Sequence, residues 1–188
     1  MNNTSQIKQS FGPNAEKYAQ SPTFATSESL SRLLEVVSPQ RGWTALDVAT
    51  GGGHTALALA ERVNRVVAAD LTPQMLIAAR NLINGRGRDN VSFCEADAQQ
   101  LPFASLAFDL VTCRIAPHHF PDAAQFVGEC ARVVKPGGTV AIIDGIVVGD
   151  GFTVRYLNAY EKLRDPSHNW LYPARRWEAF FKGAGLRV

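Results

Sequence analysis

A glycine-rich turn, followed at a distance by an acidic residue, is the part of the sequence best suited to bind a ligand. Gly51, Gly52 and Gly53 follow the apolar segment 43–48 and precede a helical pattern. Glycine lets the backbone approach a ligand closely, and the free N–H groups at the start of a helix bind carboxylate or phosphate groups. Asp70 ends the next apolar segment, where a carboxylate accepts hydrogen bonds from ribose hydroxyls in nucleotide-binding folds. The turn and Asp70 together predict a site for a nucleotide-like cofactor.

Two other interpretations of these residues stay open at this point. Asp70 could instead cap the helix that starts at Thr72 and Pro73. The run Gly51-Gly52-Gly53-His54-Thr55-Ala56 also fits the G-x-G-x-x-G/A pattern of domains that bind nicotinamide dinucleotides. The turn therefore predicts a cofactor without identifying it.

The elements that must position the turn alternate between short apolar runs and helical patterns. This alternation is typical of a doubly wound, mostly parallel α/β sheet of the Rossmann-like kind, with helices on both faces. Thr72 is placed to cap the helix that begins near Pro73. Strands are expected at 43–48, 65–70, 91–96, 108–113 and 138–144, and helices at 27–37, 53–62, from 73, at 123–134 and at 175–182.

The length of 188 residues predicts one domain, 1–188. Its expected parts are an N-terminal helical cap at about 1–40, a cofactor-binding core at 41–145, an acceptor-side insertion at 146–175, and a last helix with the start of a sixth strand at 176–188.

Three segments, in order along the chain, resemble motifs of the class I S-adenosylmethionine-dependent methyltransferases, most closely the group that includes the ubiquinone and menaquinone C-methyltransferases. Segment 46–53 is similar to the family's first motif, a carboxylate on the strand followed by small and glycine residues, although Ala49 stands where glycine is usual. Segments 95–103 and 131–138 resemble the third-strand motif and the turn before the fifth strand. The likeness covers about 11–188 and implies S-adenosyl-L-methionine as the cofactor.

The resemblance also implies contacts to the nucleoside half of the cofactor. Asp70 is expected to accept hydrogen bonds from two ribose hydroxyls, and Asp97 one from the adenine amino group. The backbone N–H of Ala98 is expected to donate to a ring nitrogen, with Leu71 and Phe103 as apolar contacts to the adenine.

For the methionine half, the resemblance implies the backbone around Ala49, Thr50 and Gly51, together with Arg114. Tyr18 matches an aromatic residue that folds over the cofactor from a leading helix. Arg114 as a surface cation and Tyr18 as a packing residue are the ordinary alternatives. The complete set of expected cofactor contacts is Tyr18, Asp47, Ala49, Thr50, Gly51, Gly53, Asp70, Leu71, Asp97, Ala98 and Arg114.

Histidines follow the fourth strand, at the end of the sheet where ligands bind in open α/β folds. The histidine side chain ordinarily titrates near neutral pH, so His118 and His119 are candidate bases for removing a proton from a methyl acceptor. Paired histidines in relatives favour His119. Alternatively, the two residues cap the helix near Pro121 or orient the loop.

A third candidate base, His168, lies in the expected insertion. Around it, Tyr156, Tyr160, Trp170 and Tyr172 could form an aromatic pocket or the insertion's own small core. The hypothesis is C- or O-methylation of a small aromatic or isoprenoid-like acceptor.

Bulk properties exclude several other classes. The formal net charge is +2 and the charges are scattered, so a nucleic-acid partner is not expected. The segment after the fourth strand also lacks the Asn/Asp-Pro-Pro-aromatic motif of nucleic-acid N-methyltransferases. Cys94, Cys113 and Cys130 have no metal-ligand spacing and suggest buried, reduced thiols. No metal site, signal peptide or membrane span is expected, and the location is expected to be cytoplasmic.

Two alternatives to the methyltransferase remain. One is an NAD-dependent oxidoreductase that uses the same turn. The other is a non-catalytic, cofactor-binding module of the same fold. The absence of the family's closing strands favours this alternative. The sixth strand barely starts at Leu186, which suggests a truncated chain, and an exposed edge at the fifth strand would favour pairing with another copy as a homodimer.

Overall fold

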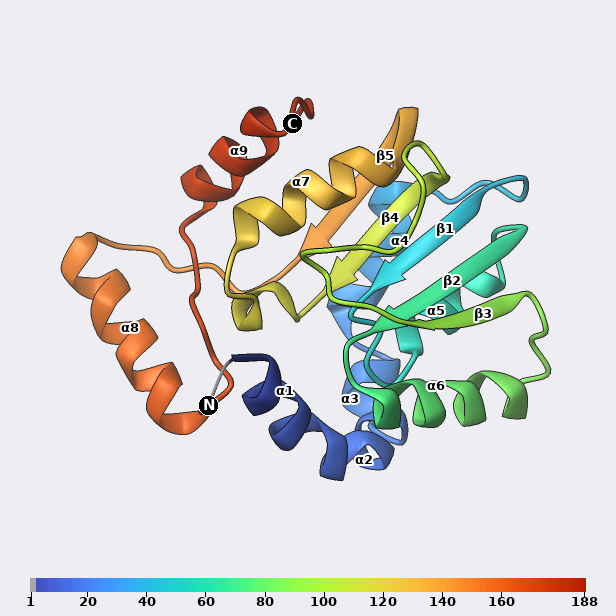
Figure 1. Cartoon of the computed structure of the whole chain (residues 1–188), viewed down its shortest axis with the longest axis horizontal. Coiled ribbons are helices and arrows are strands. Elements are labelled where there is room, and N and C mark those ends of the chain that lie inside the picture. Colours follow the sequence, from blue (N-terminus) through green and yellow to red (C-terminus); the bar gives the residue numbers. More distant parts are fainter. Residues whose placement is uncertain (1–2) are drawn as a thin grey trace.

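Five parallel strands form one sheet in the computed structural model, which describes residues 3–188 (Figure 1). The strand order is β3-β2-β1-β4-β5. The order reverses beside β1, so the carboxyl ends of β1 and β4 flank the crevice where such sheets bind ligands. The strands are β1 (Thr44–Val48), β2 (Arg65–Asp70), β3 (Val91–Glu95), β4 (Phe108–Arg114) and β5 (Val134–Ile143).

Nine α-helices and two short 3-10 helices complete the described part of the chain. In Figure 1 the α1–α3 segment lies beyond the arrowheads of the strands, and α8 lies apart on the left. The helices are α1 (Asn3–Phe11), η1 (Gly12–Asn14), α2 (Ala15–Ala19), α3 (Pro22–Ala25), α4 (Glu28–Val37), α5 (His54–Ala60), α6 (Pro73–Gly85), η2 (Pro117–His119), α7 (Ala123–Val133), α8 (Gly151–Arg164) and α9 (Ala174–Gly183).

Apolar side chains cover both faces of the sheet. On one face, Leu46 and Val48 of β1 belong to a core cluster with Phe126 of α7 and Trp177 of α9. On the other face, Ala45 belongs to a second cluster, with residues of α4, α5 and α6. Because strand side chains alternate between faces, continuous apolar strands require this two-sided cover. The doubly wound α/β fold expected from the sequence is confirmed.

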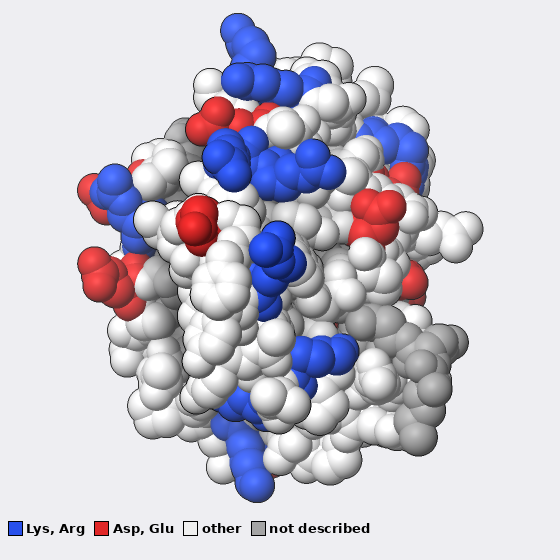
Figure 2. Space-filling view, turned by 90° about the vertical axis from the view of Figure 1, so that its left-hand side faces the viewer, with Lys and Arg blue, Asp and Glu red and all other residues white. Residues whose placement is uncertain are grey.

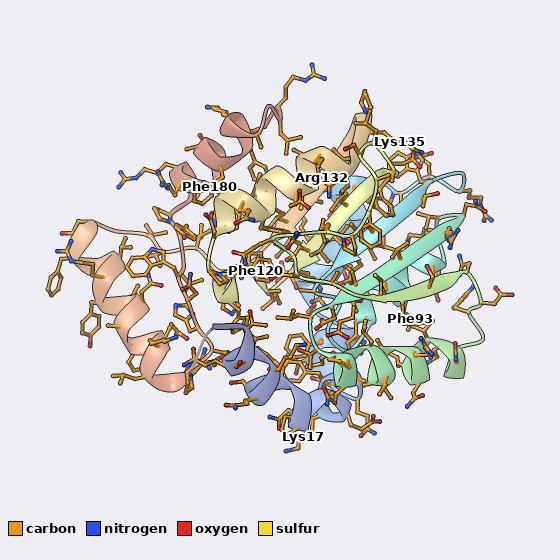
Figure 3. All side chains as sticks on the ribbon, viewed as in Figure 1. Lys17, Phe93, Phe120, Arg132, Lys135 and Phe180 are labelled. Carbon is orange, nitrogen blue, oxygen red and sulfur yellow. The ribbon has the colours of Figure 1, made fainter. Side chains whose placement is uncertain are left out.

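The fifth strand begins four residues earlier than expected. Phe108 pairs with Val134, but Leu110 pairs with Thr139, so the chain bulges between these positions. Lys135 anchors the bulge by donating to Asp109 at 2.8 Å, at the end of the sheet opposite Lys17 (Figure 3). The turn that was expected to precede the strand is therefore part of its first, irregular section.

Other expectations need correction. Thr72 makes no side-chain cap hydrogen bond to α6; the carboxylate of Asp70 accepts from the N–H of Thr72 instead. Residues 146–175, expected to form an insertion, contain α8, a helix that the sequence pattern did not predict; Asp150 caps its first turn. The described residues after α9 form no strand: Leu186 donates its N–H to the carbonyl of Phe181.

No helix within residues 3–188 is both long enough and apolar enough to cross a bilayer.

Candidate functional site

A cavity of about 280 Å³ opens at the carboxyl ends of the strands. Its wall includes the turn after β1, the ends of β2 and β4, the segment after β3, and residues from α1, α2 and α3. Phe120, also in the wall, lies where the chain passes from the sheet toward α7 (Figure 3). The size is close to the lower limit of typical small-molecule sites. Among the expected contacts that line the cavity are Tyr18, Asp47, Ala49, Thr50, Gly51, Asp70, Leu71, Asp97, Ala98, Arg114, His118 and His119.

The turn after β1 bends sharply through left-handed backbone conformations. Ala49, Gly51 and Gly53 have φ angles of 52°, 55° and 89°. Glycine adopts this region freely, whereas alanine does so at a cost. Thr50 donates its N–H to the carbonyl of Ala69, which fixes the turn against β2. Alanine at position 49 therefore adopts a left-handed conformation of the kind that glycine reaches freely.

A buried carboxylate stabilises the turn through hydrogen bonds. Asp47 accepts hydrogen bonds from the hydroxyls of Thr50 at 2.7 Å and Thr112 at 2.8 Å. Burial raises the pKa of Asp47 to about 6, and the two hydroxyls act against that rise. Asp47 lines the cavity, and in this structure its partners are the turn and β4.

Gly52 allows the leading helices to lie against the turn. A Cβ at this position would lie 2.6 Å from the backbone nitrogen of Ala19 and 2.7 Å from the carbonyl carbon of Tyr18. Gly53 is confined differently, because its Cβ would lie 2.8 Å from the Cβ of Ala79 in α6. The sequence singled out Gly51 and Gly53, but the contact of Gly52 with α2 could not be seen in it.

Asp70 connects the turn to the next helix. Its Oδ2 accepts from the N–H of Gly51 at 2.8 Å, and its Oδ1 accepts from the N–H of Thr72 at 2.9 Å. Burial raises the pKa of Asp70, and these two backbone donors oppose the rise. Asp70 thus holds Thr72, the residue before α6, without bonding the N–H groups of the helix itself, and it also lines the cavity.

The segment after β3 contributes another acidic residue to the wall of the cavity. Asp97 accepts from the N–H of Gln99 at 2.8 Å and lines the cavity with Ala98 and Leu71. Phe103, expected to contact an adenine, packs edge-on against Phe108 and is not among the described residues that line the cavity.

Arg114 joins the end of β4 to the leading helices. Its guanidinium donates to the hydroxyls of Thr55, Ser27 and Ser29 and to the carbonyl of Phe24, at 2.8–3.1 Å. Partial burial lowers its pKa. The residue is therefore no free surface cation: it holds the N-terminal segment over the cavity that it lines. The three partners on that segment lie 85–90 residues away in the sequence.

Tyr18 sits in the part of the wall that this segment supplies. Its ring stacks on Phe24 with centroids 5.2 Å apart and meets Phe11 edge-on. Nε2 of His54 forms a hydrogen bond with the backbone carbonyl oxygen of Tyr18 at 3.0 Å. Half-burial raises the pKa of the Tyr18 hydroxyl. Tyr18 both packs and lines the cavity, so the two roles weighed for it are compatible.

His118 forms an ion-pair arrangement with Asp144 at the end of β5. Its Nδ1 lies 2.6 Å from Oδ1 of Asp144, whose side chain is almost wholly buried. Asp144 accepts this bond, since a carboxylate has only acceptors to offer. No hydrogen bond in the described residues involves the other ring nitrogen, Nε2. The sequence did not identify Asp144, because 26 residues separate it from His118.

His119 belongs to a different chain of hydrogen bonds. Its Nδ1 lies 3.1 Å from the hydroxyl of Ser167, which donates to Asp165 at 2.6 Å. Because the hydroxyl of Ser167 donates its proton to Asp165, it can only accept a hydrogen bond from Nδ1 of His119. Burial, and then the neighbouring His118, lower the pKa of His119 to about 4. His119 is therefore neutral near pH 7 and a weak base.

His168 lies close to these residues but is buried away from the cavity wall. Its Nε2 bonds Oδ1 of Asn158 in α8 at 2.9 Å, and it is not among the described cavity-lining residues. The aromatic residues expected around His168 do not lie together. Tyr172 packs on Trp177, whereas Tyr156 and Tyr160 are exposed. These two tyrosines form neither a pocket nor a core, because α8 turns them toward solvent.

Comparison with known proteins decides the family. A family model described as "Methyltransferase domain" matches residues 46–142, which run from β1 to β5. The chain belongs to this methyltransferase family. The match contains the turn after β1, Asp70, Asp97 and both cavity histidines. It disfavours the oxidoreductase alternative, which the turn alone had left open.

Two relatives show the similarity in more detail. The uncharacterized methyltransferase YcgJ of Bacillus subtilis is 35% identical over 176 residues, 94% of this chain and 70% of YcgJ. The crystal structure of YcgJ has a TM-score of 0.82 and 33% identity, covering 85% of this chain and 68% of that one. A demethylmenaquinone methyltransferase of Thermus thermophilus is 45% identical over 101 residues, which are 53% of this chain and 46% of the relative.

A more distant structure shares only the fold. Phosphoethanolamine N-methyltransferase 2 of Haemonchus contortus, solved in complex with S-adenosyl-L-methionine, has a TM-score of 0.71 at 22% identity. The alignment covers 98% of this chain and 41% of that protein.

Proposed function

We propose that this methyltransferase binds S-adenosylmethionine in the cavity and transfers its methyl group to a small-molecule acceptor. One observation carries the proposal: the turn after β1 and His118 line the same cavity. A donor site and a base thus share one space, and the family match supports the reaction class. When bound, the cofactor supplies an electrophilic methyl group on its sulfonium.

The residues at the ends of β2 and β3 suit the nucleoside half of the cofactor. Each oxygen of the Asp70 carboxylate accepts one backbone hydrogen bond, and a carboxylate has about four acceptor sites. Asp70 therefore retains capacity for two ribose hydroxyls. Asp97 uses one oxygen for Gln99 and retains capacity for the adenine amino group. Leu71 and Ala98 supply apolar wall beside them.

The methionine half fits the other side of the turn. Arg114 places a cation in the wall at the end of β4, where it can attract the cofactor's carboxylate. The backbone of Ala49, Thr50 and Gly51 lines the same region. Tyr18 supplies an aromatic wall from the leading helices, which exclude water from the methyl group.

On the acceptor side, His118 has the arrangement of a general base. Asp144 fixes the imidazole with its proton on Nδ1 and would stabilise the imidazolium after proton transfer. Nε2 is then the atom that removes a proton from the acceptor. We favour His118 over His119 because the low pKa of His119, about 4, leaves it little tendency to hold a proton. His168 has no place in this scheme, since Asn158 holds it away from the cavity wall.

An acceptor that needs such a base is a hydroxyl, or a carbon activated by a neighbouring hydroxyl, as in a phenolic or quinol ring. The similarity to a demethylmenaquinone methyltransferase supports an aromatic ring of this kind. We therefore propose C- or O-methylation of a phenolic or quinone-precursor ring.

The test is calorimetric titration with S-adenosylhomocysteine and, separately, with NAD. We expect S-adenosylhomocysteine to bind and NAD not to bind. Asp97→Ala should raise the Kd for S-adenosylhomocysteine about tenfold or more, the cost of a lost hydrogen bond to a charged group. Asp89→Ala, an exposed carboxylate before β3, is the matched control and should leave Kd unchanged. Binding of NAD alone would reject the proposal.

A further inference from the structure

The helix α8 turns its apolar side toward solvent. Phe152, Tyr156, Tyr160 and Leu163 are 69%, 62%, 55% and 86% exposed. They follow one another at intervals of four, four and three residues, so they form one stripe along the helix. We call these four residues the α8 stripe. A surface helix normally buries such a stripe against the core.

Polar contacts attach the opposite side of α8. Asn158 is buried, accepts from the N–H of Leu171 at 2.6 Å and donates to the carbonyl of Leu171 at 3.1 Å. Lys162 donates to the carbonyls of Pro166 and His168. The helix is thus held in place by hydrogen bonds, and its orientation leaves the stripe uncovered. The segment before it also exposes Ile146 and Val148.

Basic residues border the α8 stripe. Arg155 and Arg164 lie on its two flanks, by helical spacing, and the guanidinium of Arg164 is paired with Glu161. Figure 2 faces this side of the molecule and shows uncharged surface with Lys and Arg side chains around it, and with Asp and Glu side chains at its left edge and in its upper part. Residues 146–188 hold seven basic residues against four acidic ones, an excess larger than the net charge of +2 of the whole chain. Within segment 150–165 the charges balance, so the excess comes from the part of the chain in and after α9; its basic residues are Arg175, Arg176, Lys182 and Arg187.

We propose that the α8 stripe binds the surface of a membrane that contains anionic lipids. Tyrosine rings favour the zone between headgroups and acyl chains, and phenylalanine and leucine insert just below it. Arginines beside such a stripe attract anionic headgroups over a short range. A second copy of the chain fits less well, because stacking two stripes brings the same basic borders together.

The position of α8 relative to the cavity gives this surface a consequence. Leu163 ends the stripe, and the next two residues, Arg164 and Asp165, line the cavity. Docking through the stripe therefore holds one wall of the cavity near the lipid headgroups. An apolar acceptor could then pass from lipid to the cavity without crossing bulk water. This last step rests on the proposed function, whereas the binding itself does not.

The test is co-sedimentation of the whole chain with vesicles. Vesicles of phosphatidylcholine mixed with phosphatidylglycerol should bind the protein, pure phosphatidylcholine vesicles should bind it weakly, and added salt should release it. The double variant Phe152→Ser/Tyr156→Ser should lower the bound fraction about tenfold. Ile77→Ser, which removes an apolar side chain exposed on α6, is the matched control and should bind as the wild type does. Thermal unfolding of each variant shows that it is folded.

Two results would overturn the proposal. One is that wild-type protein stays in the supernatant with anionic vesicles. The other is that the wild type is a dimer by light scattering, the double variant is a monomer, and neither binds vesicles; the stripe would then be a protein interface. Calorimetry with S-adenosylhomocysteine is independent of both results, so failure of lipid binding is distinguishable from failure of the proposed function.

Discussion

The backbone N–H of Gly51 donates to Oδ2 of Asp70 at 2.8 Å, which joins the turn after β1 to the end of β2. The same carboxylate holds the first turn of α6 through Thr72. One acidic side chain thus positions two of the elements that line the cavity. Asp70 is therefore expected both to bind the cofactor and to shape the site. A substitution of Asp70 should affect the two roles together.

Gly52 should be intolerant of any side chain. In Gly52→Ala the new Cβ would meet the backbone of Tyr18 and Ala19 at under 3 Å, and backbone atoms there have no rotamer to relieve the contact. We expect a loss of about 1–3 kcal/mol in the free energy of unfolding, the usual cost of overpacking. Weaker binding of S-adenosylhomocysteine should accompany it, because α2 carries Tyr18.

The matched control is Gly42→Ala, where a Cβ meets nothing within 4 Å. Urea unfolding and calorimetry on both variants measure the effects. Equal stabilities for the two variants would contradict the close contact between the turn and α2.

Asp47 should make stability depend on pH. Its pKa rises from 3.8 in the unfolded chain to about 6 in the folded one, so between these values the folded state binds the extra proton. The free energy of unfolding must then fall as pH rises through this window. Relative to Asp47→Asn, the wild type should lose about 2 kcal/mol between about pH 4 and pH 6.5. Urea unfolding across this range measures the difference, and parallel pH curves would contradict a raised pKa.

The sequence identified the strands and the turn because their signals are local. Continuous apolar runs such as 65–70 are the direct consequence of a sheet buried on both faces, and β2 has those bounds in the structure. The helix α8 was not predicted. Its aromatic residues suggested a pocket or a small core in the sequence, whereas in the structure Tyr156 and Tyr160 face solvent. Asp144 and Ser167 were missed because their histidine partners lie 26 and 48 residues away. Spacing along the chain carries no signal for such contacts.

Ala49 should be improved by glycine. At a φ of 52° an alanine costs about 1–2 kcal/mol, more than the loss of one partly buried methyl group, about 0.8 kcal/mol. We expect Ala49→Gly to raise the free energy of unfolding by about 0.5 kcal/mol. Ala58→Gly, inside α5, is the control and should lower it by about 1 kcal/mol. Urea unfolding decides; destabilisation by Ala49→Gly would show that packing of the methyl group outweighs the backbone term.

Asp144→Asn tests the proposed base directly. The amide keeps the shape of the side chain and removes the negative charge that would stabilise a protonated His118. With a phenolic acceptor, and release of S-adenosylhomocysteine as the measure, kcat should fall about 100-fold, within the range for general base catalysis. The Kd for S-adenosylhomocysteine should stay unchanged, because Asp144 is not among the described cavity-lining residues. His118→Gln should lower kcat at least as far, and Asp89→Asn, an exposed carboxylate, should have no effect. If Asp144→Asn keeps full activity while His119→Gln loses it, His119 is the base, and the proton passes toward Ser167 and Asp165 instead.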